Sequence, residues 1–473
     1  MIFSSIPFLY YFLPMVLLLY YIVPKRCKNG ALLLSSLVFY AWGEPKAVIV
    51  MIVSIMTSYL CGILIGFYKR KESRWSRVFF ILGAGISLSF LLYFKYMGFF
   101  ISNISAVTGI SMPIAKVALP VGISFYTFQL VSYLADVYRG TVSEQKNLID
   151  LAAYVVMFPQ LIAGPIVRYT DIALQLKQRS HSFEQMAQGI QRFVIGMSKK
   201  VLIADALGKL CSYFQDSSDL SVLYIWLYGI AFMLQIYFDF SGYSDMAIGL
   251  GKMFGFTFME NFDYPYISRS ITEFWRRWHI SLGSWFRDYV YIPLGGNRAS
   301  KKRWLFNILV VWMLTGFWHG AAWNFILWGL YFAVLLLIEK TWLHTFLEKH
   351  KIIAHIYVLL LVLFGFVMFN APSVAVGLTQ IGNMFGYNLP LISAESCYYL
   401  KSYGVVLILA MIGATPLPKR VYEILKRNVQ SVKRPMCAAI LSYVEMLVCI
   451  GLLLLMTAYF VDGSFSPFLY FRF

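Results

Sequence analysis

The segment VLYIWLYGIAFMLQIYFDFSGYSDMAIGL, residues 222–250, is longer than the roughly 20 apolar residues that a helix needs to cross a bilayer. It carries two carboxylates, Asp239 and Asp245. Charged groups at membrane depth are costly unless they are paired, so we expect these two to pair with Lys or Arg of neighbouring spans and hold the helices together. The segment predicts a membrane-spanning helix packed among other helices.

Similar apolar segments recur on both sides of it. We expect spans near residues 2–23, 31–43, 46–68, 78–100, 117–138, 150–166, 190–212, 222–250, 304–318, 320–342, 353–371, 402–418 and 437–461. Segments 31–43 and 150–166 are short and are interpreted as re-entrant or tilted. No long polar stretch separates these segments, so we predict one all-α membrane domain over residues 1–473, with about ten to twelve spans.

The composition agrees with a polytopic membrane protein. The chain has 473 residues, 60% hydrophobic and 13% charged, with a mean hydropathy of +0.68, whereas soluble domains carry about 25% charged residues. The net charge of +18 does not indicate nucleic-acid binding, because the basic residues lie between apolar segments. Basic clusters at 25–28 and 69–77 are typical of cytoplasmic loops and place the N-terminus outside.

Several other classes of site find no support. The six cysteines show neither a CxxC pair nor metal-ligand spacing, and His344 and His350 are six positions apart in a polar loop, so no metal site is expected. Phosphate-binding loops, GxSxG elbows and HExxH motifs are also missing. The N-terminal segment has no signal-peptide pattern, and we interpret residues 2–23 as a retained span.

Residues 262–303 interrupt the apolar pattern with arginines and aromatic residues. Ser270 or Thr272 is a plausible N-cap, with Glu273 in the first turn. If one helix follows, it carries an apolar face on one side and cations beside an imidazole on the other. The apolar face would hold Trp275, Trp278, Leu282 and Trp285, and the cationic face Arg276, Gly283 and Arg287 beside His279. The turn Pro293-Leu294-Gly295-Gly296-Asn297 would end this helix.

Two histidines lie in the most aromatic part of the chain, His279 in FWRRWHISL (274–282) and His319 in GFWHGAAWN (316–324). A buried histidine can act as a general base toward a hydroxyl group. Alternatively, His319 is a core imidazole bonded to a backbone carbonyl, and His279 an interfacial residue beside its arginines. The arginine cluster likewise has two interpretations, a face that touches lipid head groups or an entry site for an anionic donor.

At these residues the chain resembles the membrane-bound O-acyltransferase (MBOAT) family, in particular its bacterial alginate O-acetylation (AlgI-like) branch. The resemblance rests on MIFSS (1–5), LPVGISFYTF (119–128), FPQLIAGPI (158–166), YFDFSGYSDMAIGLG (237–251), the run 271–297 and Trp318-His319-Gly320. It implies a bacterial cytoplasmic-membrane protein in which a ring of tilted helices, with re-entrant or interfacial helices, surrounds a central tunnel. It also matches His319 to the family's key histidine and His279 to its second polar active-site position.

The predicted activity is O-acyl transfer, with acetyl as the expected group. No cofactor is expected to stay bound, and an acyl thioester (acetyl-CoA or an acyl-carrier protein) would be the co-substrate. We assign donor or substrate binding to Arg276, Arg287, Trp278, Trp285, Trp318 and Asn324, and tunnel shaping to Asp239 and Asp245. Expected partners are membrane lipid and an extracytoplasmic acetyltransferase or acceptor protein. A carrier protein is a further candidate on the cytoplasmic side.

Two other functions stay open at this stage. One is D-alanyl transfer to teichoic acid, as in the related DltB-like branch, with a carrier protein as donor. The other is a non-catalytic role, as an acyl transporter or as a scaffold for a secreted transferase, in which both histidines would be dispensable.

Overall fold

A computed structural model describes residues 2–113, 117–162, 164–386, 389–431 and 435–463, and within these ranges all regular structure is helical. Seven helices in the described ranges are long and apolar enough to cross a membrane. They cover Ala47–Arg70, Trp75–Thr108, Val222–Met253, Trp323–Lys349, Lys351–Asn370, Ala394–Gly413 and Ala439–Val461. The remaining predicted spans correspond to shorter helices, except that 190–212 lies within a continuous helical stretch over residues 183–216, which is not among the seven. The expected span 150–166, for example, divides at Met157 into two short helices.

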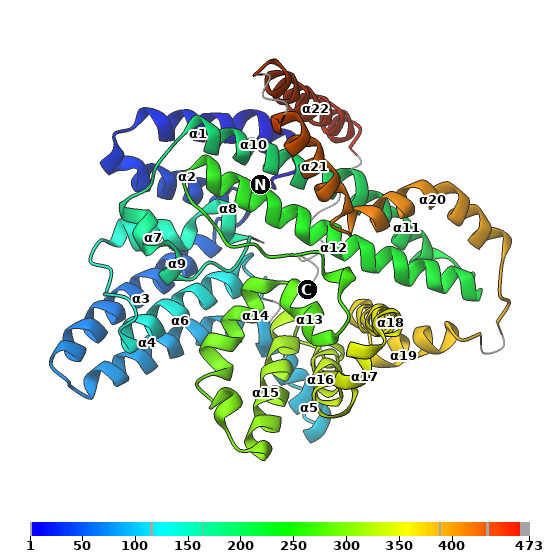
Figure 1. Ribbon diagram of the computed structural model, residues 1–473. Helices are drawn as coiled ribbons and strands as arrows, with labels where there is room; N and C mark the ends of the chain where they lie inside the picture. Colours follow the sequence, from blue (N-terminus) through cyan, green and yellow to red (C-terminus); the bar gives the residue numbers. More distant parts are fainter. Residues whose placement is uncertain (1, 114–116, 163, 387–388, 432–434, 464–473) are drawn as a thin grey trace.

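Most of the N-terminal part forms one side of the molecule (Figure 1), whereas residues Met97–Thr108 reach across to Trp323. Its longer helices, α3 and α4, pack against each other and against α6. The elements are α1 (Leu13–Ile22), α2 (Lys28–Gly43), α3 (Ala47–Arg70), α4 (Trp75–Leu91), α5 (Met97–Thr108), α6 (Ile123–Arg139), α7 (Leu148–Val156), α8 (Phe158–Leu161) and α9 (Tyr169–Lys177).

The helix α12 (Val222–Met253) crosses the middle of the molecule and packs along α10 (Phe183–Ser198) and α11 (Asp205–Asp216) (Figure 1). The backbones of α10 and α12 approach closely at glycines. A Cβ added to Gly196 would lie only 2.6 Å from the Gly242 carbonyl oxygen. Small residues at such crossings are the usual way in which helices pack inside membranes.

The predicted ionic links between helices are confirmed on α12. The Lys200 ammonium lies 2.7 Å from carboxylate oxygens of both Asp239 and Asp205, and all three side chains are buried. Asp245 is 2.7 Å from Lys199 and 2.8 Å from Arg192. These pairs tie α12 to α10 and to the start of α11.

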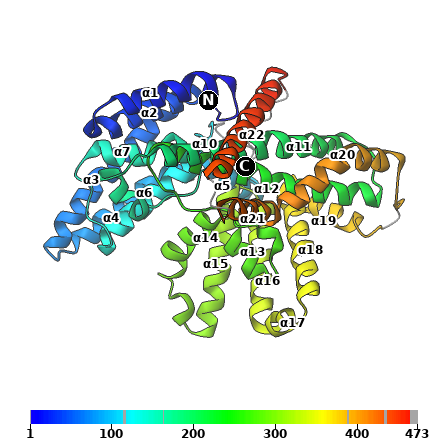
Figure 2. The ribbon, with the colours of Figure 1, turned by 45° about the horizontal axis from the view of Figure 1, so that its top comes forward.

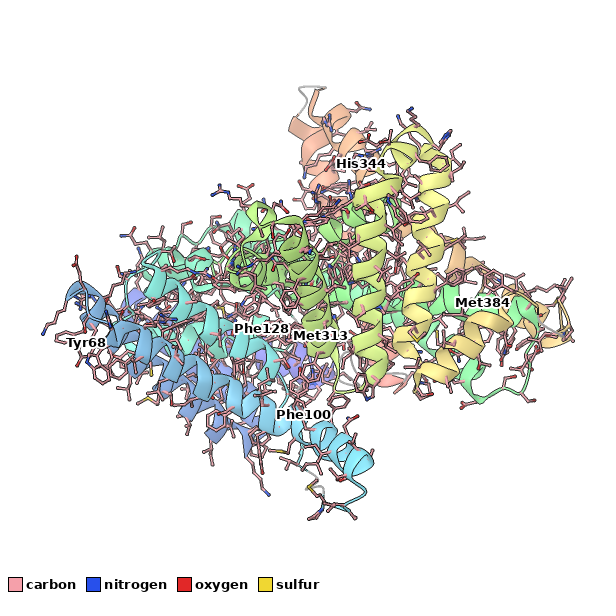
Figure 3. All side chains as sticks on the ribbon, turned by 90° about the horizontal axis from the view of Figure 1, so that it is seen from below. Tyr68, Phe100, Phe128, Met313, His344 and Met384 are labelled. Carbon is pink, nitrogen blue, oxygen red and sulfur yellow. The ribbon has the colours of Figure 1, made fainter. Side chains whose placement is uncertain are left out.

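The site-bearing helices follow α12 in the sequence and lie beneath its centre in Figure 1. They are α13 (Ile271–Arg277), α14 (Ile280–Phe286), α15 (Lys301–His319) and α16 (Trp323–Ile338). Figure 2 shows α15 and α16 projecting from the same side of the molecule as α18. In Figure 3, α16 and α18 run alongside each other, with His344 at the end where α16 leads into α17.

The C-terminal helices complete the bundle around α12. They are α17 (His344–Lys349), α18 (Lys351–Asn370), α19 (Val374–Asn383), α20 (Ala394–Gly413), α21 (Leu417–Ser431) and α22 (Pro435–Val461). Of these, α18, α19 and α20 contact α12, and α22 contacts α10.

Candidate active site

The segment that carries His279 is two short helices, and the prediction of one continuous helix was wrong. Helix α13 begins as predicted at Ser270, whose hydroxyl oxygen accepts from the Glu273 backbone N–H at 2.9 Å. Helix α13 ends at Arg277, and His279 has φ +45° and ψ +54° before α14 begins. A residue in this left-handed conformation cannot continue a right-handed helix, so the chain turns at the histidine.

This turn buries the His279 ring, which is 2% exposed. Its Nδ1 lies 3.2 Å from Oδ1 of Asn261, and its ring packs edge-on against Phe240 with 4.7 Å between centroids. His279 lies outside the seven spanning helices, and its burial lowers the pKa of the imidazole. The ring is therefore neutral at physiological pH.

His319 is the last residue of α15 and is 7% exposed. Three aromatic rings surround it, with centroids 5.0 Å (Trp318), 5.2 Å (Trp328) and 5.3 Å (Phe369) from the imidazole. Lys95, from a π-helical turn between α4 and α5, donates from Nζ to the carbonyls of Trp318 at 2.6 Å and His319 at 3.2 Å. These are carbonyls that the end of a helix leaves without intrahelical partners, so Lys95 fixes the end of α15 that bears the histidine.

Both histidines line one cavity of about 600 Å³, which we call the histidine cavity. Trp278, Leu282 and Val311 contribute to its apolar wall, and Arg276, Arg287 and Lys340 to its cationic part. Arg276, Gly283, Arg287 and His279, which the sequence placed on one helix face, all reach this cavity despite the break. A neighbouring polar cavity of about 500 Å³ shares Thr272, Arg276 and Lys340 with it.

A second cavity of about 310 Å³, the Lys95 cavity, is lined by Glu44, Lys95, the start of α6 and apolar side chains. Helix α6 has one end at each cavity region. Its first residues Ile123, Ser124 and Phe125 line the Lys95 cavity, whereas at its last residue Arg139 donates to the carbonyl of Asp288, next to Arg287. Seventeen helical residues extend about 25 Å. The Lys95 cavity and the Arg287 side of the histidine cavity therefore lie at opposite ends of α6.

The structure separates the other predicted site residues into two groups. Arg276, Arg287 and Trp278 line the histidine cavity. Trp285 instead stacks on Phe128 at 3.8 Å between centroids, and Asn324 is buried with its amide donating to Ala371 O. Trp318 contacts the rings of both histidines. These three side chains support the walls around the cavity, and Asp239 and Asp245 form the ion pairs described above.

The structure adds residues that the sequence did not indicate. Asn261, Lys95 and Lys340 each contact a histidine or line its cavity. None of them lies in a local motif of the chain. Glu339 also contributes, since its carboxylate accepts from the backbone N–H groups of Ile271 at 2.6 Å and Thr272 at 3.1 Å and so links α16 to the start of α13.

Comparison with known proteins places these features among related chains. The family model described as "MBOAT, membrane-bound O-acyltransferase family" matches residues 141–379. The chain is 43% identical over 395 residues to a probable alginate O-acetylase AlgI of Azotobacter vinelandii, covering 82% of this chain and 78% of the relative. It is 34% identical over 425 residues to a peptidoglycan O-acetyltransferase of Helicobacter pylori, with 82% and 80% covered. A teichoic acid D-alanyltransferase of Bacillus subtilis is 35% identical over 231 residues, with 46% and 57% covered.

Proposed function

The chain belongs to the membrane-bound O-acyltransferase family, and we propose that it moves a small acyl group, most simply acetyl, across the membrane for O-acetylation of an extracytoplasmic polysaccharide. The predicted family, helical membrane fold, enzyme class and membrane location are confirmed. The donor, the direction of transfer and the acceptor belong to the proposal. Its donor is a thioester on the cytoplasmic side.

The histidine cavity is the observation that carries this proposal. It connects two buried imidazoles with the cationic side chains of Arg276 and Lys340 in a single space. Cationic groups suit the phosphates of a thioester carrier, and the apolar wall suits its flexible arm. The three rings around His319 leave it in a closely packed aromatic environment, which favours a small acyl group over a long chain.

The residues then perform acyl transfer as follows. His319, as general base, takes the proton of an acceptor hydroxyl while the hydroxyl oxygen attacks the thioester carbonyl. The C–O bond forms, the C–S bond breaks, and the departing thiolate takes up the proton. His279 lines the same cavity and holds the acceptor molecule in position beside His319.

The acceptor reaches the site from the Lys95 cavity in this proposal. That cavity lies at the other end of α6 from Arg287 and the basic cluster 69–77, as the contact between Arg70 and Glu144 near the end of α6 indicates. With basic loops on the cytoplasmic side, the Lys95 cavity opens outward. A separate extracytoplasmic acetyltransferase or acceptor protein would pass the acyl group to the polymer.

D-alanyl transfer to teichoic acid is the second candidate, supported by the partial similarity to the Bacillus subtilis enzyme. That similarity covers 46% of this chain, against 82% for the alginate and peptidoglycan O-acetylation relatives. The broader coverage favours acetyl.

The test is the amount of polymer-linked acetyl ester in cells that express wild type or His319→Ala at matched membrane levels. We expect the ester to fall to background in His319→Ala, and to be unchanged in the control His350→Ala, whose side chain is exposed and outside the three cavities described. Equal ester in wild type and His319→Ala would reject the proposal in favour of a transporter or scaffold. Polymer-linked D-alanine in place of acetyl would favour the second candidate.

A further inference from the structure

The peptide segment around Asn261 lies against the turn that holds His279. The Asp263 N–H donates to the carbonyl of Arg277 at 2.9 Å, and the Ile280 N–H donates to the carbonyl of Asn261 at 3.0 Å. These two bonds bracket the left-handed His279 on both sides. Because a non-glycine residue rarely adopts this conformation, the paired segment is what holds it there.

The side-chain amide of Asn261 has a determined orientation. The side chain is buried, and one of the two terminal atoms of its amide lies 3.2 Å from the Ser281 backbone N and 2.9 Å from the Ser281 hydroxyl oxygen. A backbone N–H can only donate, so the amide atom that faces it is the carbonyl oxygen Oδ1. The amide nitrogen Nδ2 correspondingly donates to the hydroxyl of Ser244 on α12 at 2.9 Å.

This orientation decides the tautomer of His279. Oδ1 of Asn261 only accepts, and it lies 3.2 Å from Nδ1 of His279. The Ser281 hydroxyl lies 3.4 Å from the same Nδ1, but its hydrogen is directed to Oδ1 of Asn261 at the shorter distance of 2.9 Å, so Nδ1 carries the hydrogen. A neutral imidazole has one N–H, which leaves the lone pair on Nε2. Within the part of the chain that the structure describes, Nε2 is buried and has no hydrogen-bond partner.

We propose that Asn261 is a positioning residue that fixes His279 in the Nδ1–H tautomer, so that Nε2 is held as a hydrogen-bond acceptor for a hydroxyl of the acceptor molecule next to the one that His319 deprotonates. The inference rests on the proposed function for the identity of that hydroxyl. It gives the two histidines distinct tasks. In its neutral form His279 receives a hydrogen bond in the site and cannot donate one from Nε2 to an oxyanion.

The first experiment tests the tautomer directly and needs no substrate. The full-length protein is labelled with ¹⁵N-histidine, and the six histidines are resolved by NMR, with His279 assigned by its loss in His279→Gln. We expect a protonated Nδ1 and an unprotonated Nε2 for His279 in wild type. In Asn261→Ala we expect a mixture of tautomers. A wild-type His279 protonated at Nε2 would overturn the inference.

The second experiment measures acetyl transfer from radiolabelled acetyl-CoA to polymer in native membrane vesicles as a function of pH. Asn261→Asp keeps an accepting oxygen at Nδ1 but adds a negative charge, which favours the imidazolium. The pKa of His279 rises, and an acceptor must be neutral, so activity is lost on acidification at a pH about 1–3 units higher than in wild type. Asn261→Ala should lower the rate about 100-fold.

The other charged groups around His279 are the same in wild type and variant. Arg276, Arg287, Lys340 and the titratable His319 line its cavity, while Asp245 and Glu260 both pair with Arg192. The control Asp263→Asn removes an exposed carboxylate from the same segment, where it pairs with Arg277. It should leave unchanged the pH at which activity is lost on acidification. The inference would be overturned if Asn261→Asp lost activity at the same acidic pH as wild type, or if Asn261→Ala kept the wild-type rate.

Measuring His319→Ala in the same vesicles distinguishes a failure of the inference about Asn261 from a failure of the proposed function. If His319→Ala loses transfer and the Asn261 variants behave as wild type, the inference fails and the proposed function stands. If His319→Ala retains transfer, the proposed function fails, and the NMR result alone decides whether Asn261 fixes the tautomer.

Discussion

Arg276 and Arg287 have different surroundings, although the sequence suggested one shared cationic face. Arg276 lines both the histidine cavity and the adjoining polar cavity, and in the described part of the chain it forms no ion pair. Arg287 is 61% exposed at its side chain and bonds to the Asp288 carboxylate at 2.7 Å. Arg276 is therefore the residue more available to an anionic donor.

We expect Arg276→Ala to raise the KM for the thioester donor about tenfold, because a hydrogen bond to a charged group contributes roughly 1.5–3 kcal/mol. Arg287→Ala should raise it less. The measurement is transfer rate against acetyl-CoA concentration, with Arg277→Ala, which removes a guanidinium held by Asp263 and Glu273, as control. Equal effects of the Arg276 and Arg287 substitutions would contradict this assignment.

At the same scale, the sequence was enough to find the two histidines but not the residue that orients one of them. An imidazole among apolar and aromatic residues is conspicuous in a sequence. Asn261 is not, because it lies 18 positions before His279 in a loop and meets it only when this loop packs against the turn between α13 and α14. Its role depends on the direction of an amide, which no pattern of residue types encodes.

At the scale of helices, the position of His319 depends on how closely α15 approaches α16. A Cβ added at Gly316 would collide with the Phe325 carbonyl, and one at Gly329 with the Trp312 carbonyl. Neither obstacle is a flexible side chain, so the helices would have to separate. The end of α15, where His319 sits, would move with them.

We expect Gly316→Ala and Gly329→Ala to lower the free energy of unfolding by about 1–3 kcal/mol or more, and with it the thermal unfolding midpoint. Acyl transfer should also fall. Thermal denaturation of the purified protein and the ester assay measure both. Gly85→Ala on α4 is the matched control, since its Cβ would meet nothing within 4 Å. Wild-type stability and activity in both α15–α16 variants would show that the close approach is not needed.

The elements themselves were predictable only where local chemistry sets them. The cap at Ser270 follows from a short motif and was predicted. The break at His279 was not, because the left-handed conformation there is imposed by the paired segment around Asn261 and is uncommon for any residue other than glycine. The periodicity of tryptophans across 275–285 therefore predicted a helix that the fold interrupts.

At the scale of the whole molecule, composition and the lengths of apolar segments were enough to predict a helical membrane domain. The pairing of Asp239 and Asp245 with basic residues was also predictable, since isolated charges are not tolerated there. The cavities were not, because each is lined by segments distant in sequence, such as Gly43, Lys95 and Pro120 around the Lys95 cavity.

The contact of Lys95 with the end of α15 has a consequence for the cell's energy supply. The membrane that carries this enzyme also stores a proton gradient, and a wet passage from one cavity to the other would discharge it. A fixed ammonium between them repels hydronium and metal cations, as positive charges do in water-selective pores. We expect Lys95→Met in proteoliposomes to pass protons faster than wild type, measured with an enclosed pH-sensitive dye, and equal rates would contradict this role. The same lysine would then keep protons and cations from crossing the membrane at the place where the acyl group is transferred.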